Sequence, residues 1–264
     1  MNRLDKEIVS RSLAPTRAKA QELIKSLNVE VNGQIVAKAS IAISDTDVIE
    51  IIDSTTLKYV SRAGLKLEKA VEQFGIDLTG KIVMDIGSST GGFTDCALQH
   101  GASKVIAVDV GTDLMHPTLR SHPKVELHEQ TNIKDLPHKY FDNLDYITID
   151  VSFISLTKIF EKLFTENCNA TVIALIKPQF ECGKKIADKY KGVILNTKIH
   201  LDILTNIISL IDSYGFKLHS LTFSPITGGD GNIEYISMFS RQPTSNANIN
   251  LQAIINSAFK EHKK

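Results

Sequence analysis

The stretch Lys81-Ile-Val-Met-Asp-Ile-Gly-Ser-Ser-Thr-Gly-Gly-Phe-Thr94 decides the fold of the larger part of this chain. Its apolar run Lys81–Ile86 predicts a buried β-strand that carries one acid, Asp85. The glycine-rich turn Gly87–Gly92 follows and opens a helix. A strand, a glycine loop and a helix in this order bring backbone N–H groups close to a bound nucleotide-like ligand. The alternative interpretation is a strand–turn–helix unit that binds nothing.

The glycine spacing in this turn is Gly-x-x-x-Gly-Gly, whereas dinucleotide-binding proteins have Gly-x-Gly-x-x-Gly. The difference favours S-adenosylmethionine (SAM), which has no pyrophosphate to cradle and whose amino-acid end needs carboxylate and amide partners. We therefore expect SAM to be bound by the residues of this motif, namely Asp85, Gly87, Ser88, Ser89, Thr90, Gly91, Gly92, Phe93 and Thr94.

Strand and helix patterns alternate after this motif, as in a doubly wound α/β domain. Further strands are predicted over residues 104–109, 124–128, 144–150, 170–177, 216–223 and 234–240, and helices over 156–164 and 199–214. Seven strands, with a glycine-rich connection between the last two, match the Rossmann-like sheet of SAM-dependent methyltransferases. In that sheet a final antiparallel strand inserts beside the fifth.

Polar residues follow the second and third predicted strands. Asp109 ends the second strand, where an acid can accept hydrogen bonds from both ribose hydroxyls of a nucleoside. The alternative role for Asp109 is to cap a helix. Val110 belongs to the same motif, and Thr131 and Asn132 follow the third strand, where methyltransferases of this fold contact adenine. We expect these four residues to bind the nucleoside part of SAM.

The first 52 residues predict a separate, small α+β domain. Two short helices are expected, the second beginning at Arg17 after a capping Thr16. The segment 29–36 then predicts a hairpin around Asn32-Gly33. The remaining boundaries are a polar linker over 53–60, a methyltransferase domain over 61–243 and an amphipathic helical extension over 244–264.

This small domain resembles the RNA-binding module of ribosomal small-subunit protein four, the S-four or alpha-L fold. The resemblance rests on Arg3-Leu-Asp5, Thr16-Arg17-x-x-Ala20, Val29-x-Val-Asn-Gly33 and Lys38. It implies that a basic helical face binds structured RNA through phosphates and shape. A capping domain with merely solvated charges is the alternative. The predicted RNA-binding residues, including a second basic segment, are Arg3, Arg11, Arg17, Lys19, Lys25, Arg62, Lys184 and Lys185.

The composition is that of a globular protein with no excess charge. The 264 residues include 30 Lys and Arg against 30 Asp and Glu, so RNA would have to meet local basic patches on a neutral body. Three widely separated cysteines indicate neither a disulfide framework nor a zinc cluster, and no metal is expected. No signal peptide and no apolar run of membrane-spanning length is found. We expect a reduced, cytoplasmic enzyme that needs no membrane and no obligatory protein partner.

Four charged residues should converge on the carboxyl edge of the sheet. Lys66 lies at the start of a helix before the first strand, Asp150 and Lys177 end apolar strands, and Glu234 starts the last strand. Charges at such positions are costly unless they meet partners or substrate. A lysine among apolar walls and beside a second cation can remove the proton from a ribose 2′-hydroxyl, and acids can orient it. A purely structural ion-pair network is the alternative.

The motifs that hold these residues resemble the TlyA family of rRNA 2′-O-methyltransferases, also called haemolysin A. They are Ser61-Arg-Ala-Gly-x-Lys-Leu67, the glycine motif, Val108-Asp-Val-Gly111, Asp150-Val-Ser-Phe-Ile-Ser-Leu156, Lys177-Pro-Gln-Phe-Glu181 and Gly231-Asn-Ile-Glu-Tyr235. The catalytic half is similar to the FtsJ ribose methyltransferases, whose Lys-Asp-Lys-Glu tetrad maps to Lys66, Asp150, Lys177 and Glu234. The resemblance implies Lys177 as the base and a cytidine ribose on ribosomal RNA as the acceptor. Family members differ in whether they modify the large subunit alone or both subunits.

Three other functions are weighed against this one. Methylation of a base amino group needs an Asp/Asn-Pro-Pro-aromatic motif, but strand four ends in Asp150-Val-Ser-Phe153. A membrane-active haemolysin needs a spanning or strongly amphipathic membrane segment, which is not visible. A non-catalytic RNA-binding factor would not need an intact tetrad and SAM loop.

Overall fold

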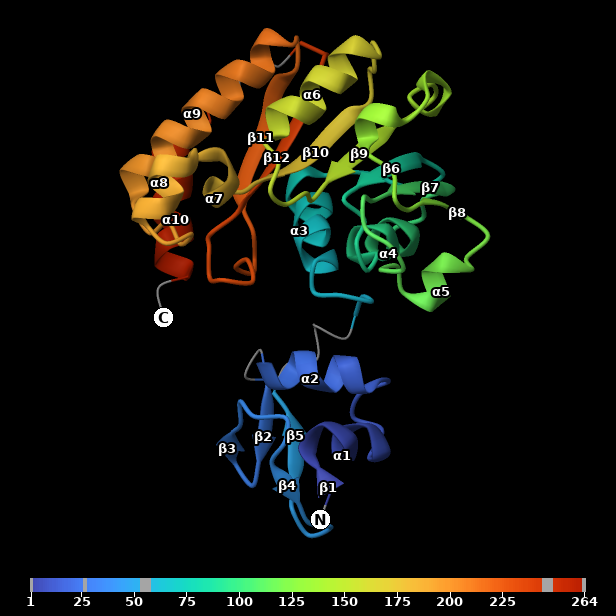
Figure 1. Ribbon diagram of the computed structural model, residues 1–264, viewed down its shortest axis with the longest axis vertical. Helices are drawn as coiled ribbons and strands as arrows, with labels where there is room; N and C mark the ends of the chain where they lie inside the picture. Colours follow the sequence, from blue (N-terminus) through green and yellow to red (C-terminus); the bar gives the residue numbers. More distant parts are fainter. Residues whose placement is uncertain (1, 26–27, 53–57, 244–248, 263–264) are drawn as a thin grey trace. The chain divides into compact units, whose positions relative to one another are not determined.

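The computed structural model describes residues 2–25, 28–52, 58–243 and 249–262. It divides the chain into two compact units, Met1–Arg62 and Ala63–Lys264 (Figure 1). Most of the predicted linker over residues 53–60 lies outside the described residues.

The small unit is built of two helices and short antiparallel strands. The helices are α1 (Leu4–Ser10) and α2 (Arg17–Lys25), and the strands are β1 (Asn2–Arg3), β2 (Val29–Val31), β3 (Gln34–Ile35), β4 (Ala42–Ile43) and β5 (Ile49–Ile51). Strand β2 lies between β3 and β5, and β1 pairs with β4. Asn32 and Gly33 both have positive φ, 53° and 76°, in the turn between β2 and β3. The predicted hairpin is therefore present at the expected residues.

The large unit contains a seven-stranded sheet in the order β11-β12-β10-β9-β6-β7-β8. The strands are β6 (Ile82–Ile86), β7 (Lys104–Val108), β8 (Val125–His128), β9 (Tyr146–Ile149), β10 (Thr171–Ile176), β11 (Lys217–Phe223) and β12 (Tyr235–Ser240). Strand β12 is antiparallel to both of its neighbours, and the strands from β10 to β8 are mutually parallel. The predicted Rossmann-like methyltransferase sheet is confirmed.

Helices cover both faces of this sheet, with α6 and α9 on one face and α3 and α4 on the other (Figure 1). The helices of the unit are α3 (Gly64–Phe74), α4 (Gly92–Gln99), α5 (Pro117–Arg120), α6 (Leu156–Thr165), α7 (Pro178–Glu181), α8 (Lys184–Lys189), α9 (Thr197–Ser213) and α10 (Leu251–Glu261), with 3-10 turns over Ile133–Asp135 and His138–Tyr140. Alternate residues of a strand face opposite sides. Met84 and Ile86 therefore join the core under α6 and α9, while Asp85 faces α4.

The C-terminal helix α10 packs onto the large unit. Ile255 and Ala258 are fully buried in the same apolar core as α6 and α9. The His262 imidazole Nε2 lies 2.9 Å from the backbone oxygen of Ser224 and donates to it. The predicted amphipathic helix is thus a structural part of the large unit.

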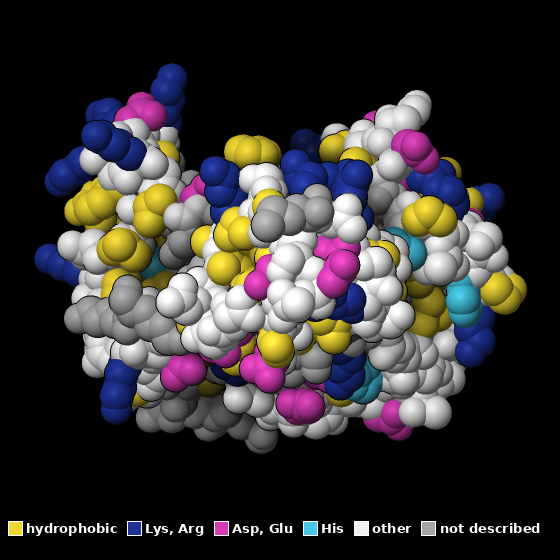
Figure 2. Space-filling model, turned by 90° about the horizontal axis from the view of Figure 1, so that it is seen from below, with side chains coloured by type: hydrophobic (Ala, Val, Ile, Leu, Met, Phe, Trp, Pro, Cys, Tyr) yellow, Lys and Arg dark blue, Asp and Glu magenta, His cyan; other side chains and the backbone are white. Residues whose placement is uncertain are grey.

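The surface charges are mixed. Basic and acidic side chains are interspersed over the face that Figure 2 presents. This matches the equal numbers of basic and acidic residues in the sequence. Among the described residues, no helix combines the length and apolar character that crossing a membrane requires.

Candidate active site

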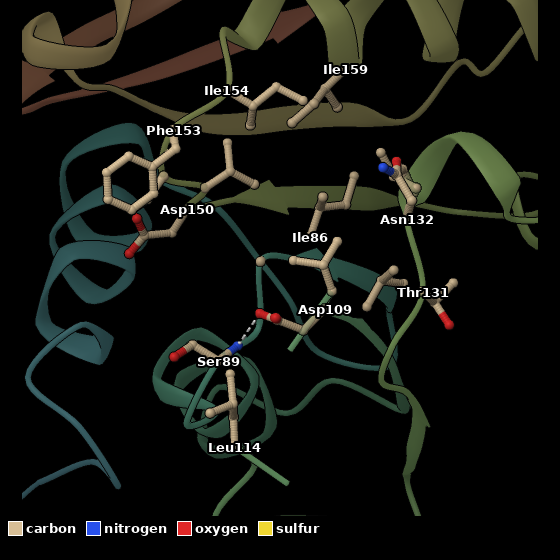
Figure 3. A pocket seen from close by; sticks show the side chains of 16 residues that line it. Ile86, Ser89, Asp109, Leu114, Thr131, Asn132, Asp150, Phe153, Ile154 and Ile159 are labelled. Atoms are coloured by element: carbon tan, nitrogen blue, oxygen red, sulfur yellow. Dashed lines mark hydrogen bonds between the residues drawn. The ribbon is translucent and has the colours of Figure 1, made fainter. Parts of the chain in front are cut away.

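A pocket of about 310 Å³ opens at the carboxyl edge of the sheet. The ends of β6, β7 and β9 and the segment after β8 form its walls, as expected for a ligand site in an open α/β sheet. It is lined by Ile86, Gly87, Ser89, Val108, Asp109, Val110, Leu114, Thr131, Asn132, Ile133, Asp150, Val151, Ser152, Phe153, Ile154 and Ile159 (Figure 3).

Asp109 occupies the middle of the pocket, between Ser89 and Thr131 (Figure 3). Its carboxylate accepts hydrogen bonds from the Ser89 backbone N–H at 2.8 Å and from the Gly111 backbone N–H at 2.7 Å. These bonds fix the carboxylate to the glycine-rich turn. Each carboxylate oxygen keeps a second lone pair, so Asp109 can still accept hydrogen bonds from two hydroxyls.

The glycine-rich motif divides into lining residues and supporting residues. Of the predicted SAM contacts, Gly87, Ser89, Asp109, Val110, Thr131 and Asn132 line the pocket. Gly91 packs so tightly that a Cβ would lie 2.4 Å from Leu119 and 2.6 Å from Met115. Phe93 is in the core, and the remaining predicted contacts Asp85, Ser88, Thr90, Gly92 and Thr94 are outside the lining.

Asp85 is buried beneath the turn. Its carboxylate accepts hydrogen bonds from the hydroxyls of Thr94 at 2.7 Å and Thr148 at 3.0 Å. Burial raises the pKa of Asp85 to about 6, with a smaller contribution from the nearby Asp150, and the two threonine hydrogen bonds oppose this shift. In this structure Asp85 joins α4 and β9 to β6 and does not face the pocket.

The four tetrad residues meet at one end of the pocket. Lys66 lies on α3, Asp150 follows β9, Lys177 follows β10, and Glu234 precedes β12. The Lys66 ammonium lies 2.6 Å from Glu234 Oε2 and 3.7 Å from Asp150 Oδ2. The Lys177 ammonium lies 2.5 Å from Asp150 Oδ1. The side chains therefore form one continuous ion-pair chain, Glu234–Lys66–Asp150–Lys177, in which each is at least 85% buried.

Two further polar residues of the tetrad motifs, Ser152 and Asn232, were not predicted as site residues. Ser152 accepts a hydrogen bond from the Lys177 ammonium at 3.3 Å. Asn232 is buried, and its side chain accepts from the Ile194 backbone N–H at 3.0 Å and donates to the Gly192 backbone oxygen at 2.8 Å. The sequence signal for both was their place in the motifs around Asp150 and Glu234.

Phe153 is a further unpredicted feature of the pocket. Its side chain is 91% exposed and its φ is 64°, an uncommon backbone conformation for a bulky residue. The ring lies beside Asp150 at the pocket rim (Figure 3) and 4.9 Å from the ring of Phe180. An exposed aromatic ring next to charged groups can stack on a nucleobase.

Comparison with known proteins places this site in a family. A family model described as FtsJ-like methyltransferase matches residues 59–241, and one described as S4 domain matches residues 2–49. Hemolysin A of Brachyspira hyodysenteriae is 45% identical over 240 residues, covering 90% of this chain and 99% of that protein. The chain belongs to the TlyA, or hemolysin A, family of FtsJ-like methyltransferases. Its larger unit is accordingly a methyltransferase and its small unit an S4 domain.

Two further relatives agree with this assignment. The 16S/23S rRNA (cytidine-2'-O)-methyltransferase TlyA of Mycobacterium tuberculosis is 34% identical over 235 residues, covering 88% of this chain and 87% of that protein. The solved structure named "Putative hemolysin from Streptococcus thermophilus" has a TM-score of 0.77 and 35% identity, covering 99% of this chain and 96% of that one.

The pocket residues fit SAM, the cofactor that the family implies. Asp109 offers a carboxylate to ribose hydroxyls, and Leu114, Ile133 and Ile154 offer apolar walls for a flat ring. In the glycine-rich turn, between the lining residues Gly87 and Ser89, the buried hydroxyl oxygen of Ser88 has no hydrogen-bond partner among the described residues. A buried polar atom of this kind can be satisfied by a bound ligand.

The predicted RNA-binding residues differ in how exposed their side chains are. Lys25, Lys184 and Lys185 are exposed, and Arg62 is half-buried. Lys19 is only 8% exposed, because its ammonium donates to the backbone oxygen of Tyr59 and pairs with Glu22 at 3.3 Å. The expectation that Lys19 lies on an exposed basic face is therefore wrong, because its side chain is buried. The sequence pattern could not indicate this burial, because the backbone oxygen that accepts from Lys19 belongs to Tyr59, 40 residues further along the chain.

Proposed function

We propose that this methyltransferase transfers a methyl group from SAM to the 2′-oxygen of cytidine in ribosomal RNA. The large-subunit RNA is the proposed substrate, and the small-subunit RNA is tested beside it. The observation that carries the proposal is the ion-pair chain at one end of the SAM-fitting pocket. The M. tuberculosis relative, which is named for this reaction, and the S4 domain support an RNA substrate.

The proposed roles follow from the order of the ion pairs. Lys177 is the last member of the ion-pair chain, and it is the proposed base for the 2′-hydroxyl proton. Asp150 bridges the two lysines and so orients Lys177, which would take up the hydroxyl proton as the neutral amine. Lys66 balances the charge of Asp150 and is the proposed cation that stabilises a developing alkoxide. Glu234 holds Lys66 in place at 2.6 Å.

SAM would supply an electrophilic methyl group to the same oxygen. The residues that would hold it are Asp109, the Gly87–Ser89 turn, Thr131 and Asn132. In the completed transfer the hydroxyl O–H bond and the methyl–sulfur bond are both broken. The proton would be on the Lys177 nitrogen, the oxygen would carry the methyl group, and the sulfur would leave with its electron pair as a neutral thioether. The rest of the catalytic effect is positioning, since the hydroxyl must be held in line with the methyl group.

The test is transfer of labelled methyl to isolated large and small ribosomal subunits that lack the modification. The methylated nucleoside would be identified by mass. We expect 2′-O-methylcytidine with the wild-type chain and none with Lys177→Ala. Lys177→Arg keeps the charge but cannot release a proton, so it should also be inactive if Lys177 is the base.

The outcomes separate the alternatives. Methyl on the cytosine ring would overturn ribose methylation, and full activity of Lys177→Arg would overturn the role of Lys177 as base. SAM binding without transfer to either subunit would indicate a different RNA substrate or a non-catalytic role on the ribosome.

A further inference from the structure

A buried carboxylate in the S4 domain holds two arginines at once. Asp5, on α1, is fully buried. It accepts from Arg3 Nε at 2.9 Å and Nη2 at 3.1 Å, from Arg17 Nε at 2.8 Å, and from Gln21 Nε2 at 2.7 Å. These charge-assisted hydrogen bonds hold the pKa of Asp5 well below its usual range. Asp5 is therefore ionised when the domain is folded.

The two arginines keep unused donors on the outside of this cluster. The Arg3 side chain is 45% exposed and the Arg17 side chain is 51% exposed. Among the described residues, no protein acceptor contacts the terminal amino groups of Arg17 or the Nη1 group of Arg3. Both backbones are fixed, because Arg3 pairs with Ala42 in the β1–β4 ladder and Arg17 begins α2. The free donors are thus presented by rigid elements.

Arg11, which directly follows α1, provides a contrast to Arg3 and Arg17. Its three guanidinium nitrogens donate to Glu7 Oε2 at 3.1 Å and to the backbone oxygens of Asp47 at 2.5 Å and Ser44 at 2.9 Å. Its donors are committed inside the domain, and its side chain is 27% exposed. Arg11 is therefore a structural residue, although the sequence suggested it as an RNA contact.

We propose that Asp5 is a positioning residue that holds Arg3 and Arg17 as a paired guanidinium site for an RNA phosphate. The inference rests on the proposed function, because it names the part of the S4 domain that binds the rRNA backbone. Two guanidinium groups on one carboxylate are oriented before binding, so less side-chain entropy is lost when a phosphate arrives. Guanidinium forks also suit the bidentate geometry of phosphate oxygens.

The sign of the effect distinguishes this role from a simple charge effect. Removing an acid makes the domain more positive, which by electrostatics alone strengthens RNA binding. Loss of orientation instead weakens it. Asp5→Asn should therefore weaken RNA binding about tenfold, the effect of losing one charge-assisted contact. Glu7→Gln removes the same charge from the same helix but leaves both arginines in place, so it should not weaken binding.

The experiment measures the affinity of the full chain for a large-subunit rRNA transcript across a series of salt concentrations. It compares wild type, Asp5→Asn, Glu7→Gln, Arg17→Lys, Arg17→Gln and the double variant Asp5→Asn/Arg17→Gln. We expect Asp5→Asn to weaken binding less in the Arg17→Gln background than in the wild type, since part of its effect acts through Arg17. Arg17→Lys keeps the charge without the fork and should weaken binding, which keeps the test valid if Asp5→Asn fails to fold.

Either of two results would overturn the proposal: unchanged or tighter binding by folded Asp5→Asn, or an Asp5→Asn effect that persists undiminished beside Arg17→Gln. Methyl transfer would be measured on the same samples. Absence of transfer by a wild type that binds RNA through coupled Asp5 and Arg17 would contradict the proposed function alone.

Discussion

Glu234 is held against Lys66 in a space that Gly228 leaves open. A Cβ on Gly228 would lie 2.7 Å from Glu234 Oε1. The Glu234 side chain is 3% exposed and pairs with Lys66 at 2.6 Å, so it has little freedom to move aside. The absence of a side chain at residue 228 thus sets the position of a tetrad member.

Gly228→Ala should lower kcat by about tenfold or more, because it displaces a group whose placement stabilises charge in the transition state. Thermal stability should change little. Gly229→Ala is the matched control, since a Cβ there meets nothing within 4 Å. Equal activity of the two variants would contradict the assigned role of Glu234.

Asp85 makes stability depend on pH. Burial raises the pKa of its carboxyl to about 6 in the folded chain, against an ordinary value of 3.8. Between these values the folded state binds more protons than the unfolded state, so the free energy of unfolding falls as pH rises. This decrease in the free energy of unfolding is absent below about pH 4. It is complete above about pH 6, where it reaches about 3 kcal/mol.

Asp85→Asn removes this ionisation. The unfolding free energy of the variant relative to wild type should therefore increase by up to about 3 kcal/mol between about pH 4 and pH 7. Urea unfolding at the two pH values measures it. A difference that is the same at both values would show that Asp85 ionises as easily in the folded chain as in the unfolded chain.

Among the elements, helix α10 lies beyond residue 241, where the FtsJ-like family model ends, yet it completes the core. It packs against α9 and β11, and its buried side chains belong to the same apolar core as those of α9. Asn250 caps its N-terminus by accepting from the Ala253 backbone N–H at 3.0 Å. The helix therefore stabilises the large unit without reaching the pocket lining.

Ile255→Ala should lower the free energy of unfolding by about 2–5 kcal/mol, because it leaves a cavity in this core. Gln252→Ala, at an exposed position of α10, should change it by less than about 1 kcal/mol. Chemical denaturation of the full chain measures both. Similar values for the two variants would mean that α10 is not packed as described.

For the molecule as a whole, zero net charge means that RNA binding depends on where the basic residues lie. Lys184 and Lys185 occupy the first turn of α8, where the helix dipole disfavours cations. The stability of α8 therefore does not explain why two lysines stand at its start, whereas binding of RNA phosphates would explain them. Lys217, by contrast, begins β11 at the amino edge of the sheet and pairs with Asp212 at 2.6 Å.

Replacing Lys184 and Lys185 together by Gln should weaken rRNA binding and reduce the slope of log affinity against log salt by about two. Lys217→Gln should leave both quantities unchanged. A salt titration with a labelled rRNA transcript measures them. An unchanged slope for the double variant would remove α8 from the RNA-binding surface.

The sequence was sufficient to predict the seven strands, the hairpin of the S4 domain and the convergence of the four tetrad residues. Buried parallel strands appear as continuous apolar runs, and in a parallel sheet their carboxyl ends meet at one edge. The residues Asp150 and Lys177 could therefore be placed together before any distance was known.

Tertiary contacts were needed to assign the individual polar side chains. Lys19 and Arg11 have the same pattern as exposed basic residues, but their acceptors come from Tyr59 and from the loop at Ser44 and Asp47. Asp85 belongs to the glycine motif, yet the alternation of strand faces turns it toward α4. Apolar periodicity is a local property of the chain, whereas a hydrogen-bond partner depends on which distant residue arrives within about 3 Å.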